Sequence, residues 1–303
     1  MEDFYAALER FLDGQGIDDL ESPQAQAKMN EFIAKWNHEN VKPGGLNANN
    51  AKTANDYIEL AQQATSNRER IKLLRKALKL DPDSIDALVM YTICRSQNTQ
   101  ELLKEMQKII KKAEDQVKED LEEDSHEFYG YFGHRPYMRA RQQYIYVLSE
   151  VGRKKDAIKE AEALLDLDHE DHLGIRDDLM AFYAYFEDCE KAEALAKRYK
   201  DDESGMMLMP LALVYYRTGD YTKANEVLKK LNSHNQDLKR FLTNAVDDRI
   251  DQMSQDYYAP GRMSELVELY NNYAFAYEHT QFFDYALRIV KTFPNTKKRA
   301  SRK

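Results

Sequence analysis

Apolar residues recur along most of the chain at steps of three and four positions, the spacing that places them on one face of an α-helix. The clearest run predicts one long helix over residues 99–124, with Lys and Glu on its opposite face. Similar runs predict further helices over residues 2–13, onward from Pro23, in the segment 51–95, over 235–255 and over 262–291, the last with a break near His279. Strict alternation of Val, Ile and Thr, the signal of a strand, is almost absent. The pattern therefore predicts an all-α protein.

Three stretches of the chain share one layout: an apolar helix, a short turn with a small or polar break, and a second helix that carries an alanine. The breaks are Gly152, Asp188 and Gly219, and the alanines are Ala157, Ala192 and Ala224. The alanines lie 35 and then 32 residues apart, which straddles the period of about 34 residues of tetratricopeptide (TPR) repeats. We therefore predict an α-solenoid of TPR-like antiparallel helix pairs, wound into a right-handed superhelix, with Ala192 and Ala224 buried where two helices approach closely.

Breaks in the pattern suggest where the parts of the chain begin and end. Ser22 followed by Pro23 predicts a helix N-cap, and the Pro-Gly-Gly run within residues 41–50 interrupts any helix. At residues 81–84 a proline ends one helix, and Asp83 or Ser84 caps the next. We predict four parts: an N-terminal helical segment (1–46), a repeat-like region with the long helix (47–125), TPR-like repeats with C-terminal capping helices (126–293) and a basic tail (294–303). The tail is either solvated chain or an electrostatic contact for an acidic partner or nucleic acid.

Charge and composition narrow the classes of partner. The chain has 303 residues, with 44 Lys and Arg against 53 Asp and Glu and a net charge of −9. Such an acidic balance disfavours a general nucleic-acid role. No apolar run approaches the ~20 residues of a membrane helix, Met1 opens no secretory signal, and the two cysteines lie far apart. We therefore expect a cytoplasmic, soluble protein without a membrane partner.

Residues 126–135 form an unusual segment, because four aromatic residues surround two glycines there: Phe128, Tyr129, Tyr131 and Phe132. One interpretation is that this loop folds back and fills a gap between helix pairs. The other is that it acts as a lid over a groove.

The only cluster with metal-ligand character in the sequence is Asp168-His169-Glu170-Asp171-His172. Histidine and carboxylate are ligands for zinc and similar ions. However, the cluster lies where one repeat ends and the next begins, where short polar residues cap helices. No nucleophile elbow or glycine-rich phosphate loop is present. We therefore expect a non-catalytic protein with no metal and no cofactor; an enzyme with a metal at this turn is the alternative.

The repeat alignment predicts a partner-binding groove on the inner face of the first helices. Its residues are Arg135, Arg139, Gln142, Tyr146, Asp177, Met206, Met209, Leu213 and Tyr216. The face changes from cationic to methionine-rich, which suits a peptide or helix with an acidic end and an apolar end. The alternative is that the chain's own C-terminal helices cover the methionine-rich part, because the strongly apolar segment 281–293 must pack somewhere. A homodimer through that segment is a further alternative.

Two segments resemble a bacterial TPR-like family that is related to the suppression-of-tumorigenicity proteins. Residues 135–141 (RPYMRAR) resemble its arginine-proline-tyrosine-methionine signature. Residues 167–176 resemble its inter-repeat segment, with Asp168 and His169 in place of the usual Asn-Pro, and residues 261–287 resemble its closing helices. The resemblance implies a helical-repeat fold with no established enzymatic activity, and it transfers no catalytic residue.

Two functions fit these observations. The first is a cytoplasmic scaffold that binds a protein or peptide. The second is a peptide-responsive, transcription-associated regulator, in which a DNA-binding part precedes a TPR sensor region. Residues 1–50 carry nine acidic and four basic residues, whereas a helix that enters the major groove should be basic. The sequence therefore favours the scaffold.

Overall fold

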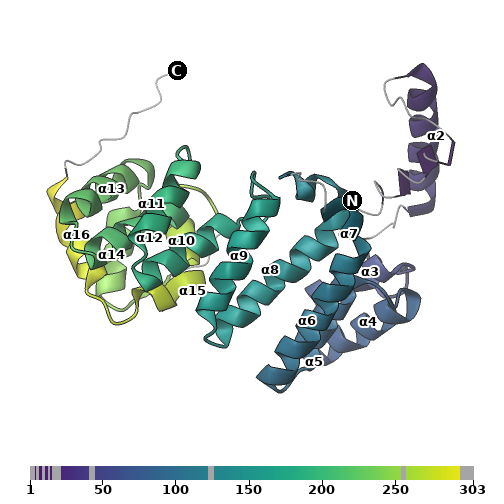
Figure 1. Cartoon of the computed structure of the whole chain (residues 1–303), viewed down its shortest axis with the longest axis horizontal. Coiled ribbons are helices and arrows are strands. Elements are labelled where there is room, and N and C mark those ends of the chain that lie inside the picture. The colour runs from purple at the N-terminus through teal and green to yellow at the C-terminus, as the bar shows by residue number, and fades with distance from the viewer. Residues whose placement is uncertain are drawn as a thin grey trace. The chain divides into compact units, whose positions relative to one another are not determined.

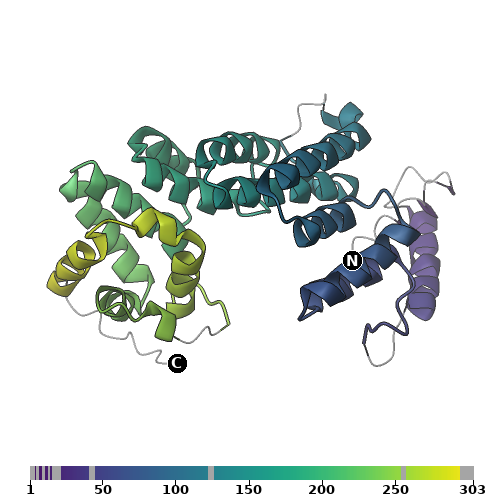
Figure 2. The same cartoon turned by 90° about the horizontal axis from the view of Figure 1, so that it is seen from below.

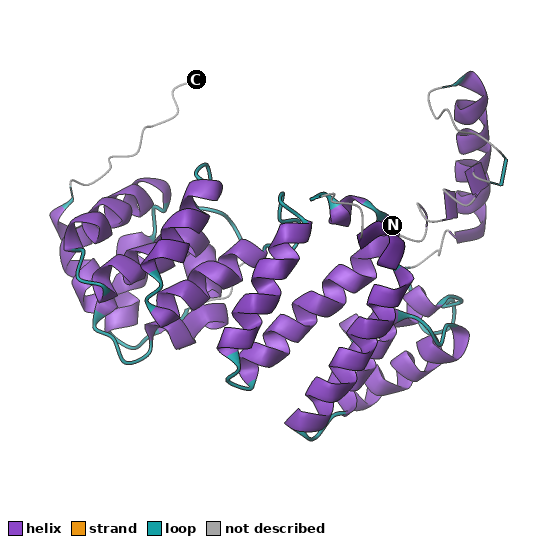
Figure 3. Ribbon diagram, in the orientation of Figure 1, coloured by secondary structure: helices purple, strands orange, loops and turns teal. Residues whose placement is uncertain are grey.

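The computed structural model describes residues 4, 7–8, 11–12, 14–15, 22–40, 45–121, 126–253 and 257–293. Within these ranges every regular element is a helix (Figures 1 and 3), which confirms the all-α prediction. The chain divides into two compact units, which we call unit 1 (Met1–Leu173) and unit 2 (Gly174–Lys303). The division of the sequence into four parts stays a prediction.

Unit 1 holds the first helices, several of which begin at a side-chain cap. They are α2 (Pro23–Asn40), α3 (Ala54–Gln63), α4 (Asn67–Leu80), α5 (Ile85–Arg95), α6 (Thr99–Gln116), α7 (Lys118–Leu121), the 3₁₀ turns η1 (Phe128–Gly130) and η2 (Phe132–His134), α8 (Arg135–Glu150) and α9 (Lys154–Leu167). Ser22 caps α2 by accepting the N–H of Ala25, and Ser84 caps α5 by accepting the N–H of Ala87. Both predicted caps are therefore confirmed. Helix α3 packs on α4, α4 on α5, α6 on α5 and α8, and α8 on α9.

The prediction of one long helix over residues 99–124 is wrong. Helix α6 ends at Gln116, because Val117 leaves the helical conformation (φ −121°, ψ 17°) and its N–H bonds to Glu114 instead of continuing the α-helical ladder. The short helix α7 follows, and Asp120 on it contacts His134 at 2.8 Å. Residues 122–124 lie outside the described part of the chain, as do most of residues 2–13 and residues 41–44.

Unit 2 holds the remaining helices (Figure 2). They are α10 (Ile175–Phe186), α11 (Cys189–Arg198), α12 (Gly205–Arg217), α13 (Tyr221–His234), α14 (Leu238–Val246), the 3₁₀ turn η3 (Ile250–Gln252), α15 (Met263–Tyr277) and α16 (Phe282–Thr292). Helix α12 packs against α10, α11, α13 and α15, and α16 packs against α13 and α14. The predicted break near His279 is confirmed, because α15 ends at Tyr277 and His279 has a φ of 56°. The helix predicted over 235–255 is shorter than expected.

Three helix pairs follow the same plan: α8–α9 in unit 1, and α10–α11 and α12–α13 in unit 2. Each pair turns at a residue in the left-handed conformation, with φ of 81° at Gly152, 58° at Glu187 and 83° at Gly219. The sequence placed the second break at Asp188; that residue instead caps α11 by accepting the N–H of Lys191. The alanines of the second helices, Ala157, Ala192 and Ala224, are all 0% exposed, which confirms the predicted burial of Ala192 and Ala224.

Candidate partner-binding surfaces

Two of the predicted groove residues hold the helices of unit 1 together. Arg139 on α8 donates two hydrogen bonds to the carboxylate of Asp86 on α5, from Nε at 3.0 Å and from Nη2 at 2.6 Å. This two-pronged contact fixes α8 against α5. Gln142 donates to the carbonyl oxygen of Leu173 at 2.8 Å. Tyr146, one turn further along α8, is exposed.

Arg135, the first residue of α8, ends the segment 126–135, which we call the aromatic segment. Its guanidinium lies 4.1 Å from the ring centroid of Phe132 and 4.8 Å from that of Tyr129, and Nε donates to the carbonyl oxygen of Tyr129. A guanidinium over aromatic faces is stabilised by the ring quadrupole. Arg135 therefore contributes to the packing of this segment.

The aromatic segment folds back onto unit 1. Phe128 is buried and stacks on the buried ring of His134, with centroids 3.9 Å apart. Nδ1 of His134 contacts the carbonyl oxygen of Phe128, and Nε2 contacts Asp120. Phe128 and His134 thus pack against each other beside α7, and both interpretations of the loop stay predictions. Tyr131 points to the surface, where it is exposed.

The methionine-rich face of α12 is covered by unit 2 itself. Met206, Met209 and Leu213 are buried, and α15 packs along α12. The two helices approach so closely that a Cβ atom on Gly205 would lie 2.9 Å from Cδ2 of Leu266. The alternative in which the chain's own C-terminal helices cover this face is therefore the one observed. Helix α15 packs along α12, and Phe282 of the predicted segment 281–293 lies against Tyr216, with ring centroids 5.6 Å apart.

The first turn of α10 carries Asp177, which is half-buried. Its neighbour Asp178 is buried, and Oδ1 of Asp178 accepts a hydrogen bond from the Tyr273 hydroxyl at 3.0 Å. This bond ties α10 to α15 within unit 2. Asp177 therefore sits beside a packed helix junction.

Tyr216, the last predicted groove residue, belongs to a group that we call the tyrosine cluster: Tyr216, Tyr221 and Tyr285. The ring centroid of Tyr216 lies 6.0 Å from that of Tyr221 and 4.8 Å from that of Tyr285. The Tyr285 hydroxyl donates to Asn225 at 2.7 Å, and burial raises the pKa of this hydroxyl. Tyr221 is 53% exposed, so the cluster presents an aromatic ring to solvent while its other rings are held by packing.

Two further exposed aromatic residues, Tyr185 and Phe186, end helix α10. Their ring centroids lie 4.9 Å apart, and Tyr185 also contacts Phe275 on α15 at 5.6 Å. Arg217, which ends α12, donates to the carbonyl oxygens of Ala184 and Tyr185. The end of α10 therefore lies beside the end of α12, and the two aromatic groups share one end of unit 2, which we call the aromatic end. Sequence reasoning missed all of it except Tyr216.

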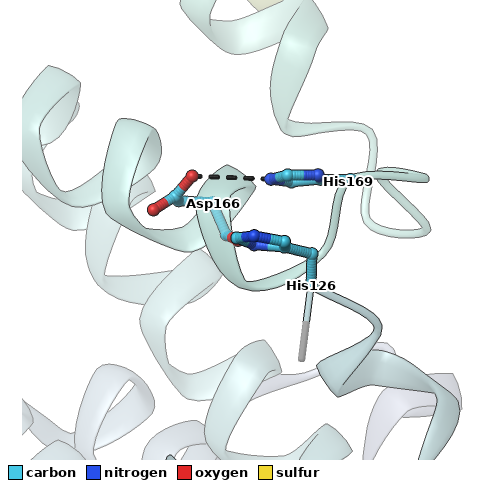
Figure 4. A group of neighbouring side chains, drawn as sticks. All are labelled: His126, Asp166 and His169. Carbon is cyan, nitrogen blue, oxygen red and sulfur yellow. Dashed lines mark hydrogen bonds and ion pairs between the residues drawn. The ribbon is translucent and has the colours of Figure 1, made fainter. Parts of the chain in front are cut away.

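The turn at Asp168–His172 does not cap a helix as the sequence predicted, because α10 begins after Gly174, which makes no side-chain cap. The buried carboxylate of Asp168 accepts the backbone N–H of His172 at 2.8 Å and contacts its Nδ1 at 2.9 Å. The metal-like group among the described residues is a different one: His126, Asp166 and His169 (Figure 4). The sequence-based cluster included His169 but neither of its two neighbours in this group. His126 could not be linked to it from the sequence, because it lies 40 residues before Asp166.

Comparison of the chain with protein-family models and with curated proteins gave no match. The resemblance to the bacterial TPR-like family accordingly stays a prediction. Among the described helices, none combines the length and the apolar character that a membrane crossing requires.

Proposed function

We propose that this chain is a non-catalytic interaction scaffold, built as an α-solenoid of TPR-like helix pairs, that binds a protein or peptide partner in the cytoplasm. The observation that carries the proposal is the repeated plan of three helix pairs, each with a left-handed turn residue and a fully buried alanine at matching intervals. Pairs of this kind each expose an apolar face that a neighbouring pair covers, and the resulting arrays serve mainly as binding surfaces.

The aromatic end of unit 2 is the surface best suited to a partner. Tyrosine and phenylalanine are enriched in the centres of protein interfaces, because a large ring with few rotatable bonds buries much area at low entropic cost. Tyr185, Phe186 and Tyr221 are exposed, yet neighbouring rings and the hydrogen bonds from Arg217 fix the backbone that carries them. A partner would therefore meet a largely preorganised surface.

The partner that fits this surface is an apolar or aromatic segment of another protein. The tyrosine hydroxyls at its rim also offer hydrogen bonds to a backbone or a polar side chain. The methionine-rich face of α12 contributes no contact, because α15 covers it.

A capture experiment tests the proposal. The untagged wild type, the double variant Tyr185→Ala/Tyr221→Ala and the control Tyr257→Ala are each incubated at low salt with extract of the native host, cross-linked, and analysed by mass spectrometry. Tyr257 is a suitable control because it is 94% exposed in the same unit. We expect one stoichiometric partner with the wild type and the control, and its loss with the double variant. Capture that survives in the double variant would move the site elsewhere, and the absence of any reproducible partner would contradict the scaffold.

A further inference from the structure

His126 and His169 face each other across a short antiparallel backbone bridge in unit 1. Glu127 pairs with Asp168 in this bridge, and the N–H of His169 donates to the carbonyl oxygen of His126 at 2.9 Å. Residues directly opposite in an antiparallel pair present their side chains on the same face, with Cβ atoms about 5 Å apart. The backbone therefore sets the distance between the two imidazoles.

Asp166 completes a group of three donors. The His126 and His169 rings stack with centroids 3.8 Å apart and planes 10° apart, and Nε2 of His169 lies 3.5 Å from Oδ1 of Asp166. One ligand atom from each of the three residues lies within 4.8 Å of the others (Figure 4). Two segments that are distant in sequence thus bring two imidazoles and a carboxylate to one point.

The tautomer of His126 follows from its hydrogen bond. Nδ1 lies 2.8 Å from the backbone carbonyl oxygen of Asp166, and a carbonyl oxygen only accepts, so Nδ1 carries the proton. In the neutral ring the lone pair is then on Nε2. Metal-ligating histidines show this same arrangement, in which one nitrogen donates to a carbonyl or carboxylate and the other binds the ion.

We propose that His126, Asp166 and His169 bind a divalent transition-metal ion of the Zn²⁺ class. Two imidazole nitrogens and one carboxylate oxygen form a donor set that Zn²⁺ accepts, whereas Mg²⁺ and Ca²⁺ require mostly oxygen donors. All three side chains are exposed, so the rings can tilt out of their stack until both lone pairs converge on the ion, and water can complete the coordination.

This site is distinct from the sequence-based candidate at residues 168–172. There, the Asp168 carboxylate is buried and holds the His172 backbone and ring, so it shapes the turn instead of facing an ion. A buried carboxylate that fixes the turn also fixes the backbone of its neighbour His169. An ion bound at the new site would join the start of the aromatic segment to the turn after α9.

Calorimetric titration of the untagged, chelator-treated full-length protein with Zn²⁺ tests the proposal. We expect one equivalent of Zn²⁺ to bind and no heat with Mg²⁺. His126→Gln and His169→Gln should each weaken Zn²⁺ binding at least tenfold, since even outer-shell partners change metal affinity by about 10–100-fold. The matched control is His234→Gln, because His234 is also exposed and also pairs with a carboxylate, that of Glu203, in unit 2.

A second variant guards against misfolding as the cause of lost binding. Asp166→Asn keeps the backbone carbonyl that His126 uses and changes only the carboxylate, and it too should weaken Zn²⁺ binding at least tenfold. Hydrogen exchange of the peptide that contains the His169 amide should slow when Zn²⁺ is added to the wild type. Absence of stoichiometric binding, or equal affinities for the wild type and the His126→Gln variant, would overturn the proposal.

Discussion

Gly261 controls how the start of α15 meets the end of α13, and so how the methionine-rich face is covered. Its φ of +69° lies in the left-handed region, and a Cβ atom there would stand 2.7 Å from the carbonyl oxygen of His234. Gly261 also accepts the N–H of Gln236 at 3.3 Å, and its own N–H donates to the buried Glu265 at 3.2 Å. No residue with a side chain fits this position without movement of the backbone.

The substitution Gly261→Ala should therefore destabilise unit 2 through two terms. The left-handed conformation costs an L-residue about 1–2 kcal/mol. The clash with a backbone carbonyl, which cannot rotate away as a side chain would, adds about 1–3 kcal/mol. Gly219→Ala isolates the first term, because Gly219 has a φ of +83° and, among the described residues beyond its chain neighbours, no atom comes within 4 Å of the place its Cβ would take. The two variants should differ by about 1–3 kcal/mol.

Urea denaturation measures this difference. With a slope of about 2 kcal/mol per molar urea, the unfolding midpoint of Gly261→Ala should lie about 0.5–1.5 M below that of Gly219→Ala. If α15 lifts before the unit unfolds, Gly261→Ala should also bind a hydrophobic dye below the transition, since Met209 and Leu213 become accessible. Equal midpoints for the two variants would refute the close approach of Gly261 to His234.

Three further predictions follow from the packing and the ion pairs. Ala224→Arg places a charge where α13 meets α12 and should unfold unit 2, measured as lost helical circular dichroism at about 37 °C; a melting curve like the parent's would show that the repeat alignment is wrong. Arg139→Ala should lower the stability of unit 1 by about 1–2 kcal/mol, and a double-mutant cycle with Asp86→Ala should recover most of this as coupling. Burial raises the pKa of Asp202, but hydrogen bonds from Ser204 and the guanidinium of Arg176 together lower it more, so the pKa lies below its usual value. The unfolded state then binds more protons than the folded state as the pH falls below about 5, and stability falls with it; Asp202→Asn should lose less stability than the wild type between about pH 5 and pH 3.

The features that the sequence predicted well are those fixed by neighbouring residues. Ser22 and Ser84 cap helices because a hydroxyl reaches a backbone N–H three residues away. Ala192 and Ala224 are buried because a helix pair with a short turn allows only a small side chain at its closest approach. Such constraints act within one turn or one helix pair, so the order of residues suffices to reveal them.

The end of α6 shows where periodicity stops being informative. Val117 and Leu121 continue the apolar stripe of the predicted helix, yet the backbone breaks at Val117. Beyond the break, Asp120 meets His134, which in turn stacks on Phe128. The break thus accompanies contacts with a later segment. Val117 is β-branched, so it leaves the helical conformation at a lower cost in free energy than its neighbours would.

The candidate sites were harder still to predict, because they are formed by residues that lie far apart in the sequence. The pattern of α12 correctly indicated an apolar face, but it contains no information on what covers that face. The cover is set by the buried Glu265 of α15, whose Oε2 accepts a hydrogen bond from Asn235 at 2.9 Å. The donors at His126 and His169 likewise meet only because a backbone bridge joins their segments.

The position of α15 also explains why binding is expected at aromatic residues and not at methionines. A surface methionine adapts to many partners, but in unit 2 that adaptability is used for internal packing, because Met206 and Met209 are buried. Part of the apolar area left at the surface of unit 2 lies at helix ends, where Phe186 and Tyr221 flank turns. Helix ends also offer backbone groups for hydrogen bonds. A partner that recognises this unit should therefore depend on ring contacts and on backbone geometry, and both are fixed before it arrives.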